Sequence, residues 1–197
     1  MTIGSKLYYL DEVDSTNEYA KNLLNDAKDG TVVLADIQTN GKGRLDRQWY
    51  SPEGGLYLSV ILFTEKPLLI PILAGVAICE TFNNNYDILP GIKWPNDILL
   101  NGKKIGGVLV ETVDTAVIVG IGINLNIVEF PEELKEIASS IFIETKKRLD
   151  KMMVYNDLCQ EIDNNYQMLK SSKANEILQK WRNYTVMFGK NVSIEIP

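Results

Sequence analysis

The spacing of apolar residues along the chain predicts a mixture of strands and helices. Runs of β-branched and apolar residues, which are typical of buried strands, occur at residues 7–10, 31–37, 56–63, 88–93, 98–100, 104–111 and 116–123. Amphipathic helical patterns occur at 15–27, 149–169 and 174–182, and residues 68–83 are apolar nearly all round, which is typical of a buried helix. Residues 131–143 are expected to form short helical turns.

Two local signals indicate how the first helix begins and how two strands connect. Ser15 lies three residues before Glu18, the spacing of a capping box, so we expect Ser15 to be the N-cap. Asn101-Gly102 is typical of a hairpin turn and joins strand 98–100 to strand 104–111, with which strand 116–123 is expected to pair. The elements together predict an α+β fold, a mixed and mainly antiparallel sheet with helices packed on it.

The last residues of the chain predict the start of a second unit. Residues 191–196 alternate between polar and apolar side chains like one strand, and a single strand cannot form a core alone. We therefore expect a main α+β domain over 1–184, followed over 185–197 by the beginning of a small C-terminal β domain that is cut short.

Composition narrows the chemistry that this fold can perform. The chain has 197 residues, of which 45% are hydrophobic and 23% charged, enough for one sizeable core. Its formal net charge of −6 argues against broad binding to a nucleic-acid backbone. Because it contains no His, His-ligated zinc, Ser-His-Asp and Cys-His sites are excluded. Catalysis must use Lys, Arg, Asp, Glu, Tyr, backbone amides or a metal held by oxygen atoms.

Cysteine usage and the N-terminal residues predict a cytoplasmic protein. Cys79 and Cys159 are far apart and form no CxxC motif, so we expect buried free thiols. The first residues carry no apolar signal core. The longest apolar stretch, 68–79, contains Pro71 and is too short to cross a membrane, so it is expected to be a core element.

The most informative segment is 38–49, Gln-Thr-Asn-Gly-Lys-Gly-Arg-Leu-Asp-Arg-Gln-Trp. Its two glycines allow the backbone to approach a ligand closely. Lys42, Arg44 and Arg47 place three cations in a short span of an acidic chain, which favours binding of phosphate, carboxylate or both. The alternative is an exposed, solvated loop. The segment is neither a Walker A loop nor a GxGxxG turn.

Two further segments have both a structural and a functional interpretation. In Lys93-Trp94-Pro95-Asn96-Asp97, Pro95 ends any regular element, so Lys93 is expected at one strand end and Asp97 at the start of the next strand. Lys93 could neutralise charge on a reacting oxygen, or simply form a salt bridge. Ser15-Thr16-Asn17 could recognise a compact polar ring as well as begin a helix.

Glycine pairs mark two more candidate positions. Gly106-Gly107 within a strand indicates a bulge or close approach of a ligand, although an ordinary hairpin would also contain them. Gly-Ile-Gly-Ile-Asn at 120–124 could frame a flat ligand such as adenine, with Asn124 supplying a donor and an acceptor, or could form a tight turn.

Taken in order, these segments resemble the biotin–protein ligase family over about residues 7–126. The resemblance is carried by Asp14-Ser15-Thr16-Asn17, by Gly-Lys-Gly-Arg-x-x-Arg-Gln-Trp at 41–49, by Ser-Pro-x-Gly-Gly-Leu-Tyr-Leu-Ser at 51–59, by Lys-Trp-Pro-Asn-Asp at 93–97, by Lys-Ile-Gly-Gly-Val-Leu-Val-Glu at 104–111 and by Gly-Ile-Gly-Ile-Asn at 120–124. It implies a class II synthetase-like catalytic domain over 1–184 followed by the start of an SH3-like β domain.

The resemblance implies a two-step reaction and a set of site residues. ATP and biotin give biotinyl-5′-adenylate, with Mg²⁺ held mainly by the nucleotide, and the biotinyl group passes to a Lys of a biotin carboxyl carrier domain. The implied biotin-binding residues are Ser15, Thr16, Asn17, Gln38, Lys42, Gly43, Arg44, Lys93, Gly106 and Gly107. The implied ATP or adenylate contacts are Arg44, Arg47, Trp49, Lys93, Asn96, Lys104 and Asn124. The implied catalytic residues are Lys93, Arg44, Lys104 and Asp97, the last a candidate base for the second step. No protein-held metal is expected.

The chain departs from the family pattern at three places. Lys42 stands where the family usually has Arg, and Lys offers no bidentate fork. No helix-turn-helix domain precedes Leu7, so a DNA-binding repressor role is not expected, and the short C-terminal β segment puts ATP affinity and carrier docking in question. We expect a carrier domain as partner and a homodimer as one possible state, with neither nucleic acid nor membrane. The alternatives are a lipoate–protein ligase-like acyltransferase and a non-catalytic biotin or nucleotide sensor.

Overall fold

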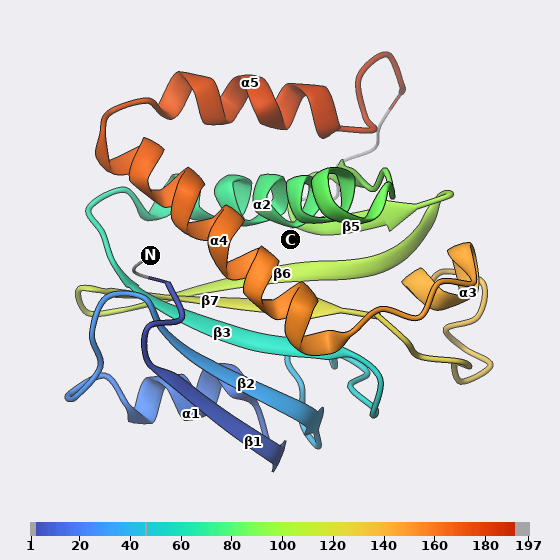
Figure 1. Ribbon diagram of the computed structural model, residues 1–197, viewed down its shortest axis with the longest axis horizontal. Helices are drawn as coiled ribbons and strands as arrows, with labels where there is room; N and C mark the ends of the chain where they lie inside the picture. The colour runs from blue at the N-terminus through green and yellow to red at the C-terminus, as the bar shows by residue number, and fades with distance from the viewer. Residues whose placement is uncertain (1–2, 46, 192–197) are drawn as a thin grey trace.

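The computed structural model describes residues 3–45 and 47–191 and contains one seven-stranded sheet (Figure 1). The strand order is β1-β2-β3-β7-β6-β5-β4. The strands are β1 Leu7–Val13, β2 Thr31–Gln38, β3 Leu56–Phe63, β4 Gly91–Lys93, β5 Asp97–Leu100, β6 Lys103–Val113 and β7 Ala116–Ile123. The helices are α1 Thr16–Asn22, the 3-10 turn η1 Pro67–Leu69, α2 Ile70–Tyr86, α3 Ile141–Thr145, α4 Lys151–Lys170 and α5 Ala174–Tyr184.

The pairing of the strands confirms the predicted α+β class. β1 and β2 are parallel, and every other neighbouring pair in the sheet is antiparallel. The β5–β6 hairpin turns at Asn101 and Gly102, whose φ angles of 51° and 85° are the left-handed values that this dipeptide tolerates. β6 pairs with β7 as predicted, and the register of β5 on β6 shifts beside the Gly106-Gly107 pair.

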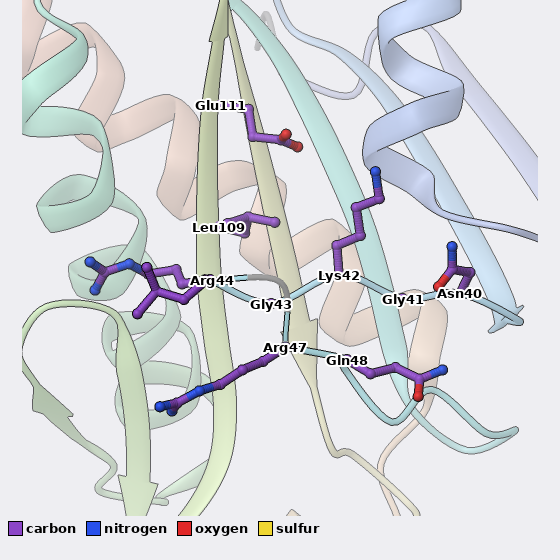
Figure 2. Close-up of a pocket in the computed structure, with 10 residues that line it drawn as sticks. Asn40, Gly41, Lys42, Gly43, Arg44, Arg47, Gln48, Leu109 and Glu111 are labelled. Atoms are coloured by element: carbon purple, nitrogen blue, oxygen red, sulfur yellow. The ribbon is translucent and has the colours of Figure 1, made fainter. Parts of the chain in front are cut away.

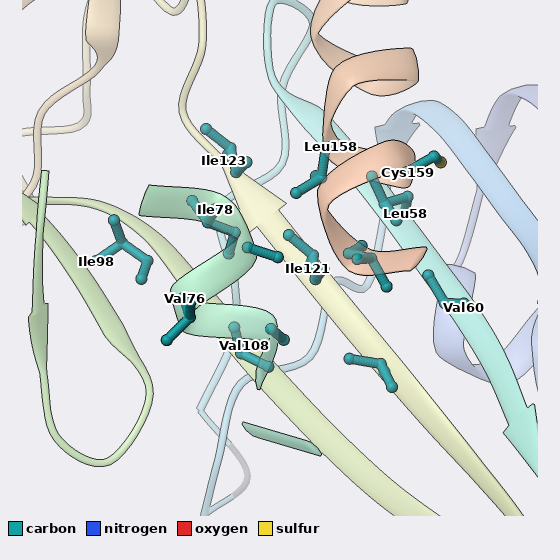
Figure 3. Close-up of a cluster of buried hydrophobic side chains, with 14 of the residues drawn as sticks. Leu58, Val60, Val76, Ile78, Ile98, Val108, Ile121, Ile123, Leu158 and Cys159 are labelled. Atoms are coloured by element: carbon teal, nitrogen blue, oxygen red, sulfur yellow. The ribbon is translucent and has the colours of Figure 1, made fainter. Parts of the chain in front are cut away.

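The main core lies on one face of the sheet, beneath α2, α4 and α5 (Figure 1). Alternate residues of β3, among them Leu58 and Val60, point to this face and pack with Ile78 of α2 and Leu158 of α4 (Figure 3). The other face carries α1 and a smaller cluster that includes Ala20, Val33 and Ile61. Because strand side chains alternate between faces, β3, β6 and β7 also present residues to the α1 face, where the candidate site lies.

Several predicted boundaries differ from the structure. α1 ends at Asn22 instead of residue 27, because Leu23 and Leu24 donate to carbonyls three residues back and tighten the last turn. α2 continues to Tyr86, where Asp87 ends it with a left-handed φ of 54°. β4 is shorter than predicted and begins after Pro90, which has no N–H for a ladder. Residues 192–196 of the predicted C-terminal strand lie outside the described residues.

Within the part of the chain that the structure describes, one helical stretch is long and apolar enough to cross a membrane by length and composition. It is Pro67–Tyr86, with a mean hydropathy of 1.3, and 56% of its most apolar window is buried inside the fold. α2 contacts α4, α5 and the sheet. The stretch is therefore a core helix here, as the sequence predicts for residues 68–83.

Candidate functional site

The α1 face of the sheet is built from glycines and small polar residues where the neighbouring chain approaches the backbone closely. A Cβ at Gly120 would lie 2.4 Å from Asn17 Oδ1, and a Cβ at Gly122 would lie 2.5 Å from Trp49 Nε1. A residue larger than glycine cannot occupy either of these positions in β7 without displacing α1 or the loop. The glycines of the 120–124 motif therefore allow both segments to rest directly on the strand.

The start of α1 is capped differently from the prediction. Ser15 is the N-cap, but its side chain makes no capping hydrogen bond. The Thr16 N–H instead donates to Gln38 Oε1, 2.9 Å away, and the Thr16 hydroxyl lies 3.1 Å from the same oxygen. Glu18 does not return to the N-cap because it pairs with two lysines. The predicted N-cap position of Ser15 is confirmed, but the hydrogen bonds of the predicted capping box do not form, and Gln38 from the end of β2 accepts the Thr16 N–H instead.

A buried polar cluster connects α1 to β3. Thr16, Asn17 and Ser59 are 4%, 3% and 0% exposed. Ser59 Oγ lies 2.8 Å from Thr16 Oγ1 and 2.5 Å from Asn17 Oδ1. On the other side, Gln38 Nε2 donates to Ser51 Oγ at 2.9 Å, and Ser51 donates to the Trp49 carbonyl at 3.0 Å. Buried polar groups are stable only when paired in this way.

Glu111 joins this cluster, although the sequence assigned it no role. Its Oε2 accepts a hydrogen bond from Asn17 Nδ2 at 2.7 Å, and its Oε1 forms an ion pair with Lys21 at 2.8 Å. Burial lowers the pKa of Lys21, but hydrogen bonds to Glu111 and Glu18 outweigh it, and the net pKa is raised. Ser59 was also missed, and the signal for both was a polar residue within an apolar strand.

The cationic segment folds into a compact loop over an open groove (Figure 2). Gly43 N–H donates to the Arg47 carbonyl at 2.7 Å, and Trp49 N–H donates to the Gly41 carbonyl at 2.8 Å. The groove has a volume of about 450 Å³. It is lined by Asn40, Gly41, Lys42, Gly43, Arg44, Leu45, Arg47, Gln48, Leu109 and Glu111.

Lys42 ties the loop to α1. Its Nζ lies 2.5 Å from Glu18 Oε1, and Lys21 pairs with the same oxygen at 2.7 Å. Hydrogen bonds from Lys21 and then Lys42 hold the pKa of Glu18 below its usual value. In Figure 2 Lys42 extends toward α1, whereas Arg44 and Arg47 extend together to the opposite side. The loop thus distributes its three cations to both ends of the groove.

The loop also contacts the 93–97 and 104–111 motifs. Arg44 Nη1 donates to Asn96 Oδ1 at 3.3 Å, while Asn96 Nδ2 donates to the Val108 carbonyl at 2.8 Å. The Trp49 ring lies against the backbone of β6 and β7, and its buried N–H has no hydrogen-bond partner among the described residues. The ring is therefore held by packing and by the nearby Lys104 ammonium.

Two lysines lie at the far end of this face. Lys104 Nζ pairs with Asp97 Oδ1 at 2.6 Å and stands 5.1 Å from the centre of the Trp49 ring. Lys93, at the exposed end of β4, lies opposite Asp97 in the β4–β5 register. The predicted placement of Lys93 at one strand end and Asp97 at the next strand start is confirmed.

Two predicted site residues have more restricted surroundings. Asn124 is 3% exposed, and its Nδ2 donates to the Ser139 carbonyl at 2.9 Å, so part of its donor capacity is already used. A Cβ at Gly106 would meet the Gly122 carbonyl at 3.1 Å and Ile98 Cβ at 3.4 Å, so this position faces the core, and its backbone alone could reach a ligand. Among residues 3–45 and 47–191, no group of three Cys, Asp or Glu side chains is arranged to hold a metal.

Comparison with known proteins places this architecture in one class. The fold is that of a protein ligase catalytic domain, and a family model described as the biotin/lipoate A/B protein ligase family matches residues 9–127. The chain belongs to this family. The match begins in β1 and ends four residues after β7, so it covers all of the sheet except the first two residues of β1, and it includes all of the motifs described above.

Individual relatives refine this assignment. The bifunctional ligase/repressor BirA of Bacillus subtilis is 37% identical over 203 residues, which cover 96% of this chain but 62% of that protein. The biotin–[acetyl-CoA-carboxylase] ligase of Mycobacterium tuberculosis is 29% identical, covering 98% of this chain and 77% of its own length. A solved structure of the Aquifex aeolicus biotin protein ligase in complex with biotin and ATP has a TM-score of 0.89 at 37% identity, covering 94% of this chain and 81% of that chain.

Proposed function

We propose that this chain is a biotin–protein ligase, which forms biotinyl-5′-adenylate from biotin and ATP and transfers the biotinyl group to a Lys of a biotin carboxyl carrier domain. The observation that carries the proposal is the position of the cationic loop. The loop lines one groove together with Glu111, and Glu111 is hydrogen-bonded to Asn17 of the polar cluster. Cations for two anionic groups therefore lie next to a polar cluster that suits a compact polar ring. The likeness to a ligase solved with biotin and ATP supports the same reading.

The first step requires no nucleophile from the protein. A biotin carboxylate oxygen attacks the α-phosphorus of ATP, a new P–O bond forms, and the bond to pyrophosphate breaks. The protein has to bring two anions together and stabilise charge on the phosphorus oxygens, which preorganised cations do well. This explains how a chain without His can catalyse the reaction. Mg²⁺ bound to the ATP phosphates would supply charge neutralisation of the leaving group.

The proposed division of roles follows the geometry of the face. Thr16 and Gln38 would receive the ureido ring, with Ser15 and Asn17 at the start of α1 and the backbone of 42–43 and 106–107 beside it. Arg44, Lys93 and Lys104 would contact the biotin carboxylate and the α-phosphate, and Arg47 and Asn96 the nucleotide phosphates. Trp49 would pack against the nucleotide, and Asn124 would contact adenine through its remaining donor and acceptor. A closed loop keeps water from the reactive anhydride.

The second step requires the acceptor amine to lose a proton. The amine nitrogen attacks the biotinyl carbonyl carbon, an amide forms, and AMP leaves. Asp97 is the candidate base, and its ion pair with Lys104 at 2.6 Å places it beside a proposed phosphate contact. The proposed setting is the cytoplasm, with a carrier protein as partner and a homodimer as one possible assembly.

The test is ATP–pyrophosphate exchange with and without biotin, followed by transfer of labelled biotin to a carrier domain. We expect biotin-dependent exchange, and at least tenfold weaker formation or retention of the adenylate in Lys93→Ala and Arg44→Ala. Exchange that depends on lipoate instead would favour the lipoate ligase alternative. Biotin binding without any exchange would identify a sensor, and either result would overturn the proposal.

A further inference from the structure

The buried polar cluster is a single chain of hydrogen bonds whose two ends can only accept. At one end the Trp49 carbonyl accepts the proton of Ser51, so Ser51 Oγ must accept from Gln38 Nε2. At the other end the Glu111 carboxylate, which forms an ion pair with Lys21, accepts from Asn17 Nδ2. The orientation of both side-chain amides is therefore determined by their partners.

The orientation of the two amides determines which way each hydroxyl of the polar cluster donates. Because Asn17 Nδ2 faces Glu111, Asn17 Oδ1 faces Ser59, whose single proton occupies that 2.5 Å contact. The 2.8 Å contact between Ser59 and Thr16 then needs the proton of Thr16. Gln38 Oε1 accepts one bond, from the Thr16 N–H, and keeps a free lone pair. The Thr16 hydroxyl lies 3.1 Å from Gln38 Oε1 and can donate to it only when its proton is free. Because that proton is used in the contact with Ser59, Thr16 Oγ1 and Gln38 Oε1 are left as neighbouring acceptors.

We propose that Glu111 is a positioning residue for substrate recognition: through Asn17 and Ser59 it sets the direction of the hydrogen bonds that make Thr16 and Gln38 acceptors for the two N–H groups of a cyclic urea. The proposal rests on the proposed function, in which biotin supplies that urea. It assigns Asn17 an indirect role, because both ends of its amide are already bonded within the protein.

The first variant is Glu111→Gln, which keeps the shape but can both donate and accept. The amide of Asn17 can then reverse, Ser59 can donate to Thr16, and Thr16 can donate to Gln38. We expect the Kd for biotin to rise about ten- to a hundredfold, as for the loss of one or two buried hydrogen bonds. The Kd for ATP is expected to change less than about threefold, because Glu111 lies at the α1 end of the groove.

The second variant separates hydrogen-bond direction from the ion pair with Lys21. Asn17→Asp alone would place two carboxylates 2.7 Å apart and is expected to weaken biotin binding at least as much. In Asn17→Asp combined with Glu111→Gln, the new amide donates to the new carboxylate, which still accepts from Ser59. Direction is restored while Lys21 remains without its Glu111 partner, so we expect biotin affinity within about fivefold of wild type.

A matched control exists on the opposite face of the sheet. Asn165 Nδ2 donates to Glu80 Oε2 at 2.8 Å, and Lys180 pairs with Glu80 Oε1 at 2.9 Å, the same Asn–Glu–Lys arrangement. Glu80→Gln is expected to lower the melting temperature as much as Glu111→Gln but to leave biotin affinity unchanged.

Isothermal titration with biotin, and separately with ATP, decides between the outcomes. The proposal is supported if Glu111→Gln raises the Kd for biotin but not for ATP, and if the double variant restores biotin affinity. It is overturned if Glu111→Gln binds biotin like wild type, or if the double variant stays as weak as the single ones. Absence of biotin binding by the wild type would remove the proposed function itself, and this inference with it.

Discussion

Replacing Gly122 by Ala tests whether the cationic loop is held closed by the Trp49 ring. The new Cβ would lie 2.5 Å from Trp49 Nε1, 2.6 Å from Cε2 and 3.0 Å from Cζ2, against about 3.5–4.0 Å for an ordinary carbon contact. The ring must lift by about 1 Å or more. Overpacking of this kind costs about 1–3 kcal/mol. Among the described residues no hydrogen bond holds the ring N–H, so only packing and the nearby Lys104 ammonium oppose its movement, and the loop should open before the sheet distorts.

The cost should therefore appear as weaker binding and not as loss of the fold. A free-energy change of about 1–3 kcal/mol corresponds to roughly 5- to 150-fold weaker binding of a ligand under the loop. Isothermal titration with biotin and ATP measures this, and a melting temperature within a few degrees of wild type shows that the fold persists.

A graded companion variant sharpens the test. A Cβ at Gly107 would lie 3.3 Å from Trp49 Cζ3, so Gly107→Ala displaces the same ring by only a few tenths of an ångström. We expect a loss below about fivefold. In a Trp94→Phe/Trp181→Phe background, the emission of Trp49 should shift to the red in Gly122→Ala and little in Gly107→Ala. Wild-type binding by Gly122→Ala, or a larger loss in Gly107→Ala, would refute the reasoning.

Three further variants test charge, chemistry and stability. Glu18→Gln removes the ion pair that holds Lys42, so trypsin should cut the empty loop about two- to fivefold faster. The pKa of Glu18 is lowered in the folded protein, so its contribution to stability is complete above pH 4.5 and is lost as pH falls through the lower folded pKa. The free energies of unfolding of wild type and Glu18→Gln, measured in urea, should therefore become equal at acid pH. Asp97→Asn should slow transfer to the acceptor Lys if Asp97 is the base, whereas an effect confined to pyrophosphate exchange would show that it only positions Lys104. Phe82→Ala in the main core, where Phe82 is 0% exposed, should cost about 3–5 kcal/mol in urea unfolding, and a loss below about 1 kcal/mol would contradict its place there.

Local patterns in the chain were sufficient for most of the fold. The bounds of β3 and β7 agree with the apolar runs at 56–63 and 116–123, and the Asn101-Gly102 turn forms where its dipeptide predicts. These features depend on neighbours within a few residues, through side-chain alternation and the φ angles that each residue tolerates. The hydrogen bonds of the predicted capping box do not form because the Glu18 carboxylate forms ion pairs with Lys21 and Lys42.

The ordered motifs also indicated which segments form the site, but not how their side chains are connected. Asn17 and Glu111 are 94 residues apart, and Thr16 and Gln38 are 22 apart. Their contacts depend on the register of β2, β3, β6 and β7 and on the glycines that let α1 rest on the sheet. A hydrogen bond forms or is lost when the donor–acceptor distance changes by a few tenths of an ångström, and a linear pattern of residues does not specify distances at that scale.

The amino-acid sequence by itself thus determined the elements of this protein, its mixed sheet and the family that its motifs resemble. Tertiary structure alone decided that Gln38 caps α1, that Lys42 is tied to Glu18, and that Glu111 completes the polar cluster. The physical reason is that secondary structure and turns follow from short-range backbone and side-chain preferences, whereas the partners of charged and polar groups are chosen by which surfaces the folded core brings together.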